Sequence, residues 1–360
     1  MTRRWFRRMS SGGGGWTGRL LRPPLWCASR VYEQIIRARN RRYDRSPDRA
    51  AGAAVPVISV GNLTVGGTGK TPLVIDLATR LVAGGHAPGV LARGYGAGGG
   101  EPGDEQLLIT RQVPSVVYVA DPDRVAGARR AVGAGAADVL ILDDGFQHRR
   151  LKRDLDIVVI DAALPFGHGH LLPRGLLREP VDGLGRCDLV VMTRCDQVGG
   201  DALRAVESQV RVRLEDQPIV RSRHVVRGVR DLATGRERAA DVEGADVLLL
   251  SAIGQPEALT RSACSIGARA CGHLDFDDHH RYRLGDCAVI ADRAARGGAR
   301  AVLTTEKDAV KLERLGFDWP IEVWVLEVAL EYLDDGARTI DHALKRLFDG
   351  DSVSDGTARV

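Results

Sequence analysis

Cysteine is scarce in this chain and gives no sign of a metal centre. The 360 residues include six cysteines, and none of them forms a C-x-x-C pair or a Cys/His cluster. Structural zinc needs about four such ligands at short spacings, so we expect no zinc site. In a chain of this size, scattered cysteines are typical of reduced thiols in the cytosol.

Long apolar runs are also missing. No uninterrupted apolar segment approaches the roughly 18 residues that span a bilayer. The first residues, MTRRWFRRMSSGGGGWTGRL, are basic but have no apolar stretch behind them, which is unlike a secretory signal. We therefore expect the protein to stay on the cytoplasmic side of the membrane.

Positive charge is concentrated at one end of the chain. The net charge is +4, but the first 49 residues hold 13 arginines and 3 acidic residues, whereas the remaining 311 hold 38 basic and 44 acidic residues. Apolar residues recur at helical spacing over residues 25–43, and Pro23 and Pro24 are expected just ahead of the helix start. Such a helix suits an anionic membrane surface, or it packs on the protein's own core. We assign no function to residues 1–20.

Short apolar runs then alternate with helical patterns. Runs at 55–60, 137–144, 155–162 and 187–193 are apolar on both faces, which indicates a parallel sheet covered by helices on both sides. Residues 218–235 alternate and contain turn residues, which favours an antiparallel pair. A second series of strands follows at 245–254, 272–276, 299–305 and 321–328. The fold class is therefore α/β, with a parallel-sheet domain, a two-stranded antiparallel linker and a smaller α/β domain.

The segment GNLTVGGTGKTP, residues 61–72, is named here the phosphate loop. It lies between an apolar strand and a helix, so its backbone N–H groups and the helix N-terminus can bind phosphate oxygens. Lys70 can reach the terminal phosphates, and Thr71 can hold Mg²⁺. Thr64 occupies the position at which the general pattern G-x-x-x-x-G-K-[ST] has a glycine. The expected nucleotide-binding residues are Gly66, Gly67, Thr68, Gly69, Lys70 and Thr71.

Two acidic residues follow a neighbouring strand in LILDDGFQH. Asp143 and Asp144 come directly after the apolar run, which is the Walker B arrangement of a magnesium ligand. A single carboxylate could instead cap a helix or belong to the surface. Two of them, in a chain with Gly-Lys-Thr, favour magnesium.

The phosphate loop and the two acidic residues do not show which group receives the phosphate. A GTP-binding switch protein would carry N-K-x-D or T-K-x-D, and TRCD (193–196) matches only in part because Arg194 replaces lysine. A kinase needs a general base, for which Asp104 in PGDEQ and the pair His279 and His280 are candidates. Asp104 also fits a turn after Gly103, and the histidines amid several aspartates also resemble a metal cluster.

A longer set of motifs resembles one family. VGNLTVGGTGKTP, LARGYG, GDEQ, DPDR, ILDDGFQHRRLKRDLDIVVIDA, LLPRGLLREP, FDDHHRY and TTEKDAVKL, in this order, resemble the tetraacyldisaccharide 4'-kinases, the lipid A kinases of Gram-negative bacteria. The resemblance runs from about Leu21 to Val328, and a threonine at the Thr64 position is part of the family's own loop. It implies transfer of the γ-phosphate of ATP, with Mg²⁺, to the 4'-hydroxyl of a tetraacylated glucosamine disaccharide 1-phosphate.

The resemblance also implies roles for particular residues. Asp104 corresponds to the catalytic base and His279 to its helper. Asp143, Asp144 and Glu179 correspond to residues that organise magnesium and the reacting phosphate. Arg178, Gln147 and His148 are assigned more loosely, to phosphate charge and the lining of the site. The family's N-terminal helix docks on the anionic cytoplasmic face of the inner membrane, where the lipid substrate lies.

The expected organisation has four parts. These are a basic segment with a membrane-associating helix (1–45), an ATP-binding domain (46–216), a smaller α/β domain (217–350) and a frayed tail (351–360). Because Asp104 and His279 fall on opposite sides of the boundary, we expect the active site in a cleft that closes by a hinge. The alternatives are a P-loop GTPase of the metallochaperone type and a membrane-surface regulator; neither nucleic acid nor a protein partner is expected.

Overall fold

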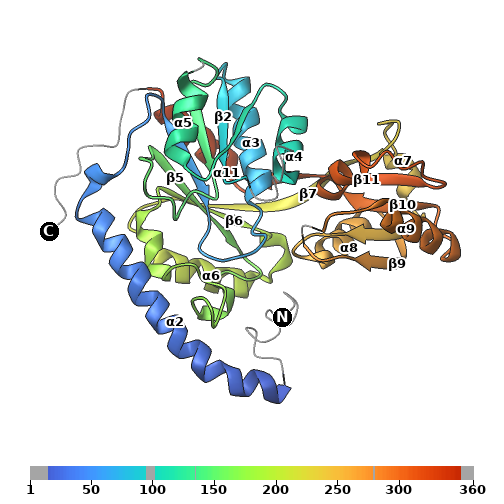
Figure 1. Ribbon diagram of the computed structural model, residues 1–360, viewed down its shortest axis with the longest axis horizontal. Helices are drawn as coiled ribbons and strands as arrows, with labels where there is room; N and C mark the ends of the chain where they lie inside the picture. The colour runs from blue at the N-terminus through green and yellow to red at the C-terminus, as the bar shows by residue number, and fades with distance from the viewer. Residues whose placement is uncertain (1–14, 95–101, 134, 279, 350–360) are drawn as a thin grey trace. The chain divides into compact units, whose positions relative to one another are not determined.

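The apolar runs of the sequence become strands in the computed structural model of the chain (Figure 1). These strands are buried on both faces. The structure describes residues 15–94, 102–133, 135–278 and 280–349. Every residue is buried in β1 (Val57–Gly61), β4 (Val139–Asp143), β5 (Leu155–Asp161) and β6 (Leu189–Thr193). These strands pair in parallel. The predicted parallel α/β sheet is confirmed.

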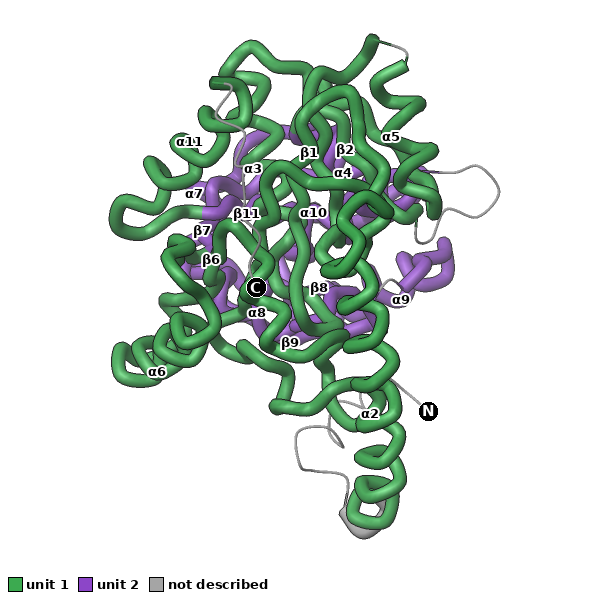
Figure 2. Tube along the Cα trace, turned by 90° about the vertical axis from the view of Figure 1, so that its left-hand side faces the viewer, with its two compact units in different colours: residues 1–95, 113–223, 331–360 green, residues 96–112, 224–330 purple. Residues whose placement is uncertain are grey.

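Contacts along the chain define two units, which Figure 2 distinguishes by colour. Unit 1 comprises the described residues of 1–95, 113–223 and 331–360, and unit 2 those of 96–112 and 224–330. The division therefore differs from two consecutive domains with a boundary near residue 216. A segment that includes Asp104 groups with the later strands, and the last helix groups with unit 1. The expected frayed tail, 351–360, lies outside the described residues.

The sheet of unit 1 has the strand order β3-β2-β4-β1-β5-β6-β7. It adds β2 (Pro88–Ala92), β3 (Val117–Ala120) and β7 (Ile219–Asp231) to the strands above. Helices α5 (Arg124–Gly133) and α6 (Gly200–Arg211) pack on one face, and α3 (Lys70–Ala83) and α11 (Gly336–Arg346) lie on the other. The buried residues of α3 are spaced for one helix face: Leu73, Val74, Leu77, Ala78 and Leu81.

In unit 2 the strand order is β7-β11-β10-β8-β9. Its strands are β8 (Asp246–Ser251), β9 (Arg269–Asp275), β10 (Ala301–Thr305) and β11 (Glu322–Tyr332). Helices α8 (Pro256–Ser265) and α9 (Leu284–Arg296) contribute to separate apolar cores on the two faces. The unit also contains α4 (Asp104–Gln112), α7 (Ala239–Val242) and α10 (Glu306–Glu313). Short 3₁₀ helices of unit 1 span Pro47–Arg49, Gly167–Gly169, Val181–Arg186 and Cys195–Gln197.

The prediction of an antiparallel pair within residues 218–235 is wrong. Most of this segment is the single strand β7, and its neighbour is β11, about a hundred residues later. The N–H of Leu333 donates to Arg221 O, and the N–H of Leu232 donates to Val323 O, so the two strands run antiparallel. Local alternation identified an extended segment, but it could not identify the distant partner.

The predicted start of the N-terminal helix is also wrong. Helix α2, which Figure 1 shows as one long helix, spans Gly15–Asp44. It contains Pro23 and Pro24 in its interior and does not begin after them. Each proline leaves unbonded the carbonyl four residues earlier, at Arg19 and Leu20. Both of these residues are exposed, so water can bond their carbonyls in place of the missing N–H groups.

One face of α2 packs on unit 1. Ile36 is buried, the Tyr32 hydroxyl donates to Arg178 O at 2.8 Å, and Asn40 Nδ2 donates to Glu179 at 3.1 Å. On the opposite side Leu20, Val31 and Ile35 remain 66%, 63% and 60% exposed. Among the described helices, none combines the length and the apolar character needed to cross a bilayer.

Candidate active site

The phosphate loop connects β1 directly to α3. Gly66 and Gly69 have φ values of 123° and 90°, a region that side chains rarely enter, so these two positions require glycine. Gly61 approaches the chain at Phe146 so closely that a Cβ atom would lie 2.5 Å from Phe146 N. Because α3 begins at Lys70, its unpaired N–H groups face the loop and provide an anion site.

Thr64 has a structural reason for not being glycine. It is buried and forms an antiparallel bridge with Leu177, and the next N–H, of Val65, donates to Leu176 O at 2.8 Å. The side chain of Asn62 donates to Thr64 O at 2.8 Å. This end of the loop is therefore extended backbone that is held by the 171–178 segment. The turn itself is formed later in the loop, around Gly66 and Gly69.

Lys70 and Asp144 meet beside the loop. Lys70 Nζ donates to Asn62 Oδ1 at 3.0 Å and lies 3.3 Å from Asp144 Oδ1. Asp144 follows β4 with a left-handed φ of 53°, and its second oxygen accepts from Arg178 at 2.6 Å. Burial raises the pKa of the Asp144 carboxyl, but Lys70 and Arg178 outweigh it, so the pKa lies below its ordinary value. Asp144 is therefore an anion held between two cations.

Asp143, the other predicted acid, ends β4. It is buried and lies in register with Val60 of β1, one residue before Gly61. The two carboxylates and the loop thus follow neighbouring parallel strands, at the edge where such sheets bind ligands. Within the described part of the chain, no three His, Cys, Asp or Glu residues are grouped as a metal cluster. Mg²⁺ does not require one, because phosphate and water oxygens supply most of its ligands.

Glu179 is fully buried, and other side chains donate hydrogen bonds to both oxygens of its carboxylate. One oxygen accepts from Gln147 Nε2 at 2.8 Å, and the other accepts from Asn40 at 3.1 Å and from Arg186 at 2.7 Å. Gln147 also donates to Asn62 O at 2.8 Å. Glu179 thereby links α2 to the phosphate loop. Asn40, Asn62 and Arg186 of this network were missed in the sequence, since no local pattern marks them.

His148 lies in the same segment and is a neutral side chain near pH 7. Burial, with the positive charges of Arg124 and Arg150, lowers the pKa of His148 to about 4. Its Nε2 atom is buried and has no hydrogen-bond partner among the described residues. A neutral imidazole of this kind is unsuited to donate a proton during a reaction near neutral pH.

The predicted base belongs to a polar cluster in unit 2. Asp104 begins α4, and its Oδ2 atom lies 3.7 Å from Lys311 Nζ of α10. Lys311 also binds the fully buried Asp308 at 2.9 Å. Asp308 in turn accepts from the N–H of Ala252 and the hydroxyl of Thr305. GDEQ and TTEKDAVKL, which are some 200 residues apart, therefore contribute to one cluster. Lys311 and Asp308 were not singled out in the sequence, although TTEKDAVKL contains them.

His279 lies outside the described residues, but its neighbour is placed. His280 stacks on Phe276 with ring centroids 4.5 Å apart, and its Nε2 atom lies 3.2 Å from Asp286. The backbone carbonyl of His280 lies 3.5 Å from Lys311 Nζ. The FDDHHRY segment therefore reaches the same lysine as Asp104.

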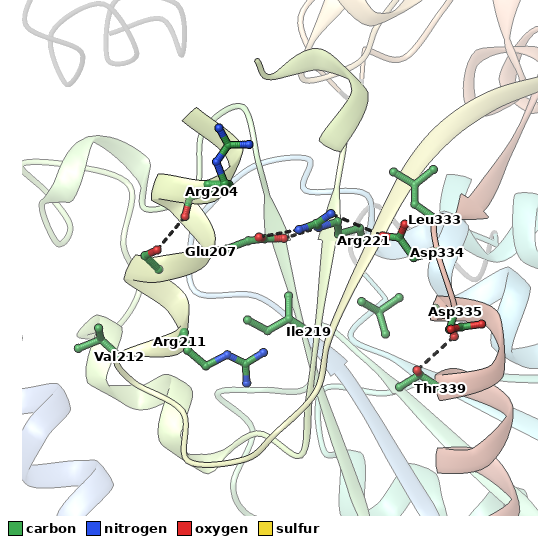
Figure 3. A pocket seen from close by; sticks show the side chains of 13 residues that line it. Arg204, Glu207, Arg211, Val212, Ile219, Arg221, Leu333, Asp334, Asp335 and Thr339 are labelled. Atoms are coloured by element: carbon green, nitrogen blue, oxygen red, sulfur yellow. Dashed lines mark hydrogen bonds and ion pairs between the residues drawn. The ribbon is translucent and has the colours of Figure 1, made fainter. Parts of the chain in front are cut away.

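A groove of about 890 Å³ on unit 1 is separate from these residues (Figure 3). It lies between α6, β7 and the start of α11, and it contains none of the predicted site residues. Its central Arg221 pairs with Glu207 at 2.5 Å and with Asp334 at 3.6 Å. The charges that line it therefore compensate each other, and the groove does not carry the nucleotide chemistry.

Comparisons with known proteins agree over most of the chain. A family model for tetraacyldisaccharide-1-P 4'-kinase matches residues 21–348. A tetraacyldisaccharide 4'-kinase from Anaeromyxobacter sp. (strain Fw109-5) is 44% identical over 313 residues, which cover 81% of this chain and 83% of that one. One from Geobacter sulfurreducens is 37% identical over 344 residues, with 90% and 94% covered.

A solved structure is similar over nearly the same length. LpxK from Aquifex aeolicus, crystallised in complex with ATP, matches with a TM-score of 0.70 at 28% identity. The match covers 91% of this chain and 99% of that chain. The similarity therefore includes both units and extends beyond the phosphate loop.

Proposed function

The chain belongs to the tetraacyldisaccharide-1-P 4'-kinase family, and we propose that it transfers the γ-phosphate of ATP to the 4'-hydroxyl of a tetraacylated glucosamine disaccharide 1-phosphate. It is an ATP-dependent kinase of lipid A biosynthesis, like its relatives. The observation that carries the proposal is the phosphate loop beside Lys70, Asp144 and Arg178 in a chain that matches this family over residues 21–348.

The chain's own residues provide for the donor. We propose that the N–H groups of residues 66–71 and Lys70 bind the phosphates of ATP, and that Arg178 neutralises charge that develops during transfer. Gln147 supports this arrangement indirectly, because it bonds the backbone of Asn62 and the carboxylate of Glu179. We assign His148 only a lining role, as a neutral group.

Side chains next to the phosphate loop are also suited to bind Mg²⁺. Asp144 Oδ1 is shielded from solvent and makes no hydrogen bond within the described chain, although Lys70 lies nearby. We propose that Thr71, Asp143 and Asp144 hold Mg²⁺ together with the nucleotide, where the ion would neutralise phosphate charge. Glu179 is a weaker candidate because its oxygens already accept hydrogen bonds from Asn40, Gln147 and Arg186.

The lipid hydroxyl that receives the phosphate must lose its proton, so the site needs a group that accepts this proton. We propose Asp104 for this role, with His279 as its helper, as the family resemblance implies. The proposal is supported by the position of Asp104 at the first turn of α4, where the ion pair with Lys311 can hold its carboxylate in place. A positioned carboxylate that accepts the hydroxyl proton typically raises the rate of such a reaction by about 10²- to 10⁴-fold.

The lipid substrate requires contact with a membrane surface. We propose that the exposed side of α2 lies on the anionic cytoplasmic face of the inner membrane. Val31 and Ile35 are four residues apart and Leu20 lies about three turns earlier, so they share one side of the helix. Trp26 is 50% exposed, and Arg19, Arg30, Arg37 and Arg41 supply positive charge along the same helix. Apolar anchors with flanking arginines are typical of interfacial helices.

The GTPase alternative is less supported than the kinase. A test compares ATP and GTP as donors for a purified lipid acceptor, with each nucleotide also offered as competitor. The kinase account predicts that ATP labels the lipid and that GTP competes poorly. Strong selectivity for GTP, or nucleotide-dependent vesicle binding without labelling of any lipid, would favour the GTPase or the membrane-surface regulator instead.

A further inference from the structure

The TRCD segment, residues 193–196, has a role at the phosphate loop that differs from base recognition. Its first residue, Thr193, is the last residue of β6. Asp196, which would contact the guanine in the GTPase interpretation, is exposed. Thr193 and Arg194 are buried, and both contact the phosphate loop. The Thr193 hydroxyl donates to Thr68 O at 2.8 Å, and Arg194 donates through one guanidinium nitrogen to Gly67 O at 3.0 Å.

Arg194 is itself held firmly. Its other terminal nitrogen forms an ion pair with Asp161 at the end of β5, and the side chains of the two residues are only 8% and 3% exposed. Its backbone has φ 58° and ψ 34°, a left-handed conformation that is unfavourable for arginine. Such strain persists where surrounding contacts fix it, and it is concentrated at functional sites. Here the contacts that fix it run to Asp161 and to the phosphate loop.

These contacts determine where the amides of the loop point. In a planar trans peptide, the C=O of one residue and the N–H of the next point in opposite directions. Bonds that draw Gly67 O and Thr68 O toward Thr193 and Arg194 therefore direct the N–H groups of Thr68 and Gly69 to the other side of the loop. Those N–H groups belong to the set that would bind phosphate.

We propose that Arg194, together with Thr193 and Asp161, is a positioning residue for ATP that presets the amides of Thr68 and Gly69 toward the phosphates. The inference rests on the proposed use of the phosphate loop for ATP. Without these contacts the peptides of the loop can rotate, and binding ATP must then order them. The affinity for ATP falls as a result, whereas the affinity for the lipid acceptor does not.

The main test variant is the double substitution Arg194→Asn with Asp161→Asn. Asparagine tolerates a left-handed backbone and is too short to reach Gly67 O, and the second change avoids a buried unpaired carboxylate. Thr193→Val removes the other contact alone. The matched control is Arg153→Asn with Asp156→Asn, a comparably buried pair at the opposite end of β5, whose exposed fractions are 11% and 7%. It tests the loss of a buried ion pair without a contact to the loop.

The readouts are equilibrium binding of a fluorescent ATP analogue, the KM values for ATP and for the lipid acceptor, and amide hydrogen exchange at residues 66–69. We expect the 194/161 variant to bind ATP about tenfold more weakly, as for loss of one hydrogen bond to a charged group. Its KM for ATP should rise by a similar factor with an unchanged KM for lipid, and exchange at 66–69 should be faster. Arg194→Lys, which keeps one charged donor, should recover part of the affinity.

Three results would overturn the inference. They are wild-type ATP affinity and wild-type exchange in the 194/161 variant, an equal loss of affinity in the 153/156 control, or a parallel rise of both KM values. If the wild-type protein itself bound no ATP, the proposed function would fail together with the inference. If the wild type and the 194/161 variant bound ATP equally well, the inference would fail and the proposed function would stand.

Discussion

Lys70 and Asp144 form an ion pair beside the phosphate loop, with Nζ of the lysine 3.3 Å from Oδ1 of the aspartate. Arg178 binds the second carboxylate oxygen at 2.6 Å. Two cations and one anion therefore meet at this point. The two cations favour a ligand that carries several negative charges, such as a triphosphate.

The Asp144 carboxylate makes stability depend on pH. Lys70 and Arg178 outweigh burial and lower the folded-state pKa, so the ionised group stabilises the fold above its unfolded pKa of about 3.9. This contribution is lost as the pH falls through the folded pKa. Asp144→Asn leaves the two cations uncompensated, so the variant should be less stable than the wild type at pH 7. Denaturant unfolding should show the difference shrinking toward pH 3.

Asp318→Asn is the control for this prediction, because Asp318 is exposed. It should differ little from the wild type at either pH. A deficit in Asp144→Asn that stays constant or grows on acidification would mean that Asp144 is not the stabilised anion described here.

Glu179 is expected to hold the fold together more than it holds a metal. Glu179→Ala leaves Arg186 without its carboxylate partner, and a broken buried pair of this kind costs about 3–5 kcal/mol of the free energy of unfolding. Glu179→Gln retains the shape and part of the hydrogen bonding. In that variant we expect the Mg²⁺ concentration for half-maximal activity to stay at the wild-type value. A large rise in that concentration would return Glu179 to the role of a magnesium-organising residue.

Asp104→Ala is expected to slow turnover by about 10²- to 10⁴-fold and to leave ATP binding unchanged, because a base acts on the hydroxyl and not on the nucleotide. Single-turnover rates and ATP titrations separate the two effects. Glu105→Ala changes the neighbouring acidic residue of the same helical turn and should retain turnover. A near wild-type rate in Asp104→Ala would exclude Asp104 as the base.

Membrane association should depend on the exposed side of α2. Removal of residues 1–43 would also remove the bond from Asn40 to Glu179, so point substitutions are the cleaner test. Val31→Glu with Ile35→Glu should weaken sedimentation with vesicles that contain anionic lipid, and high salt should weaken binding of the wild type. Val212→Glu places a charge at another exposed valine, which directly follows α6 and is 82% exposed, and should have no effect. Equal vesicle binding by all three proteins would rule out this docking surface.

Local patterns in the sequence predicted the parts of the fold that depend on neighbouring residues. Continuous apolar runs identified β1, β4, β5 and β6, and the glycine spacing identified the phosphate loop with Lys70 and Thr71. The short strands β2 and β3 were not predicted, although β3 lies in the apolar run VVYVA, which could have identified it.

Long-range relationships could not be read in this way. The pairing of β7 with β11 and the contact between Asp104 and Lys311 join residues about 100 and 200 positions apart. The bonds from Thr193 and Arg194 to the phosphate loop depend on the order of β1, β5 and β6 in the sheet. TRCD resembled a base-reading motif because sequence gives residue types and not the direction of their side chains.

The central claim is tested most directly by following the γ-phosphate of ATP. Purified protein is incubated with γ-labelled ATP, Mg²⁺ and the tetraacylated disaccharide 1-phosphate in detergent, beside an acceptor that lacks the 4'-hydroxyl. The account predicts label in the first lipid, none in the second, and loss of labelling in Asp104→Ala. ATP binding without labelled lipid, or equal labelling of the acceptor without the 4'-hydroxyl, would contradict it.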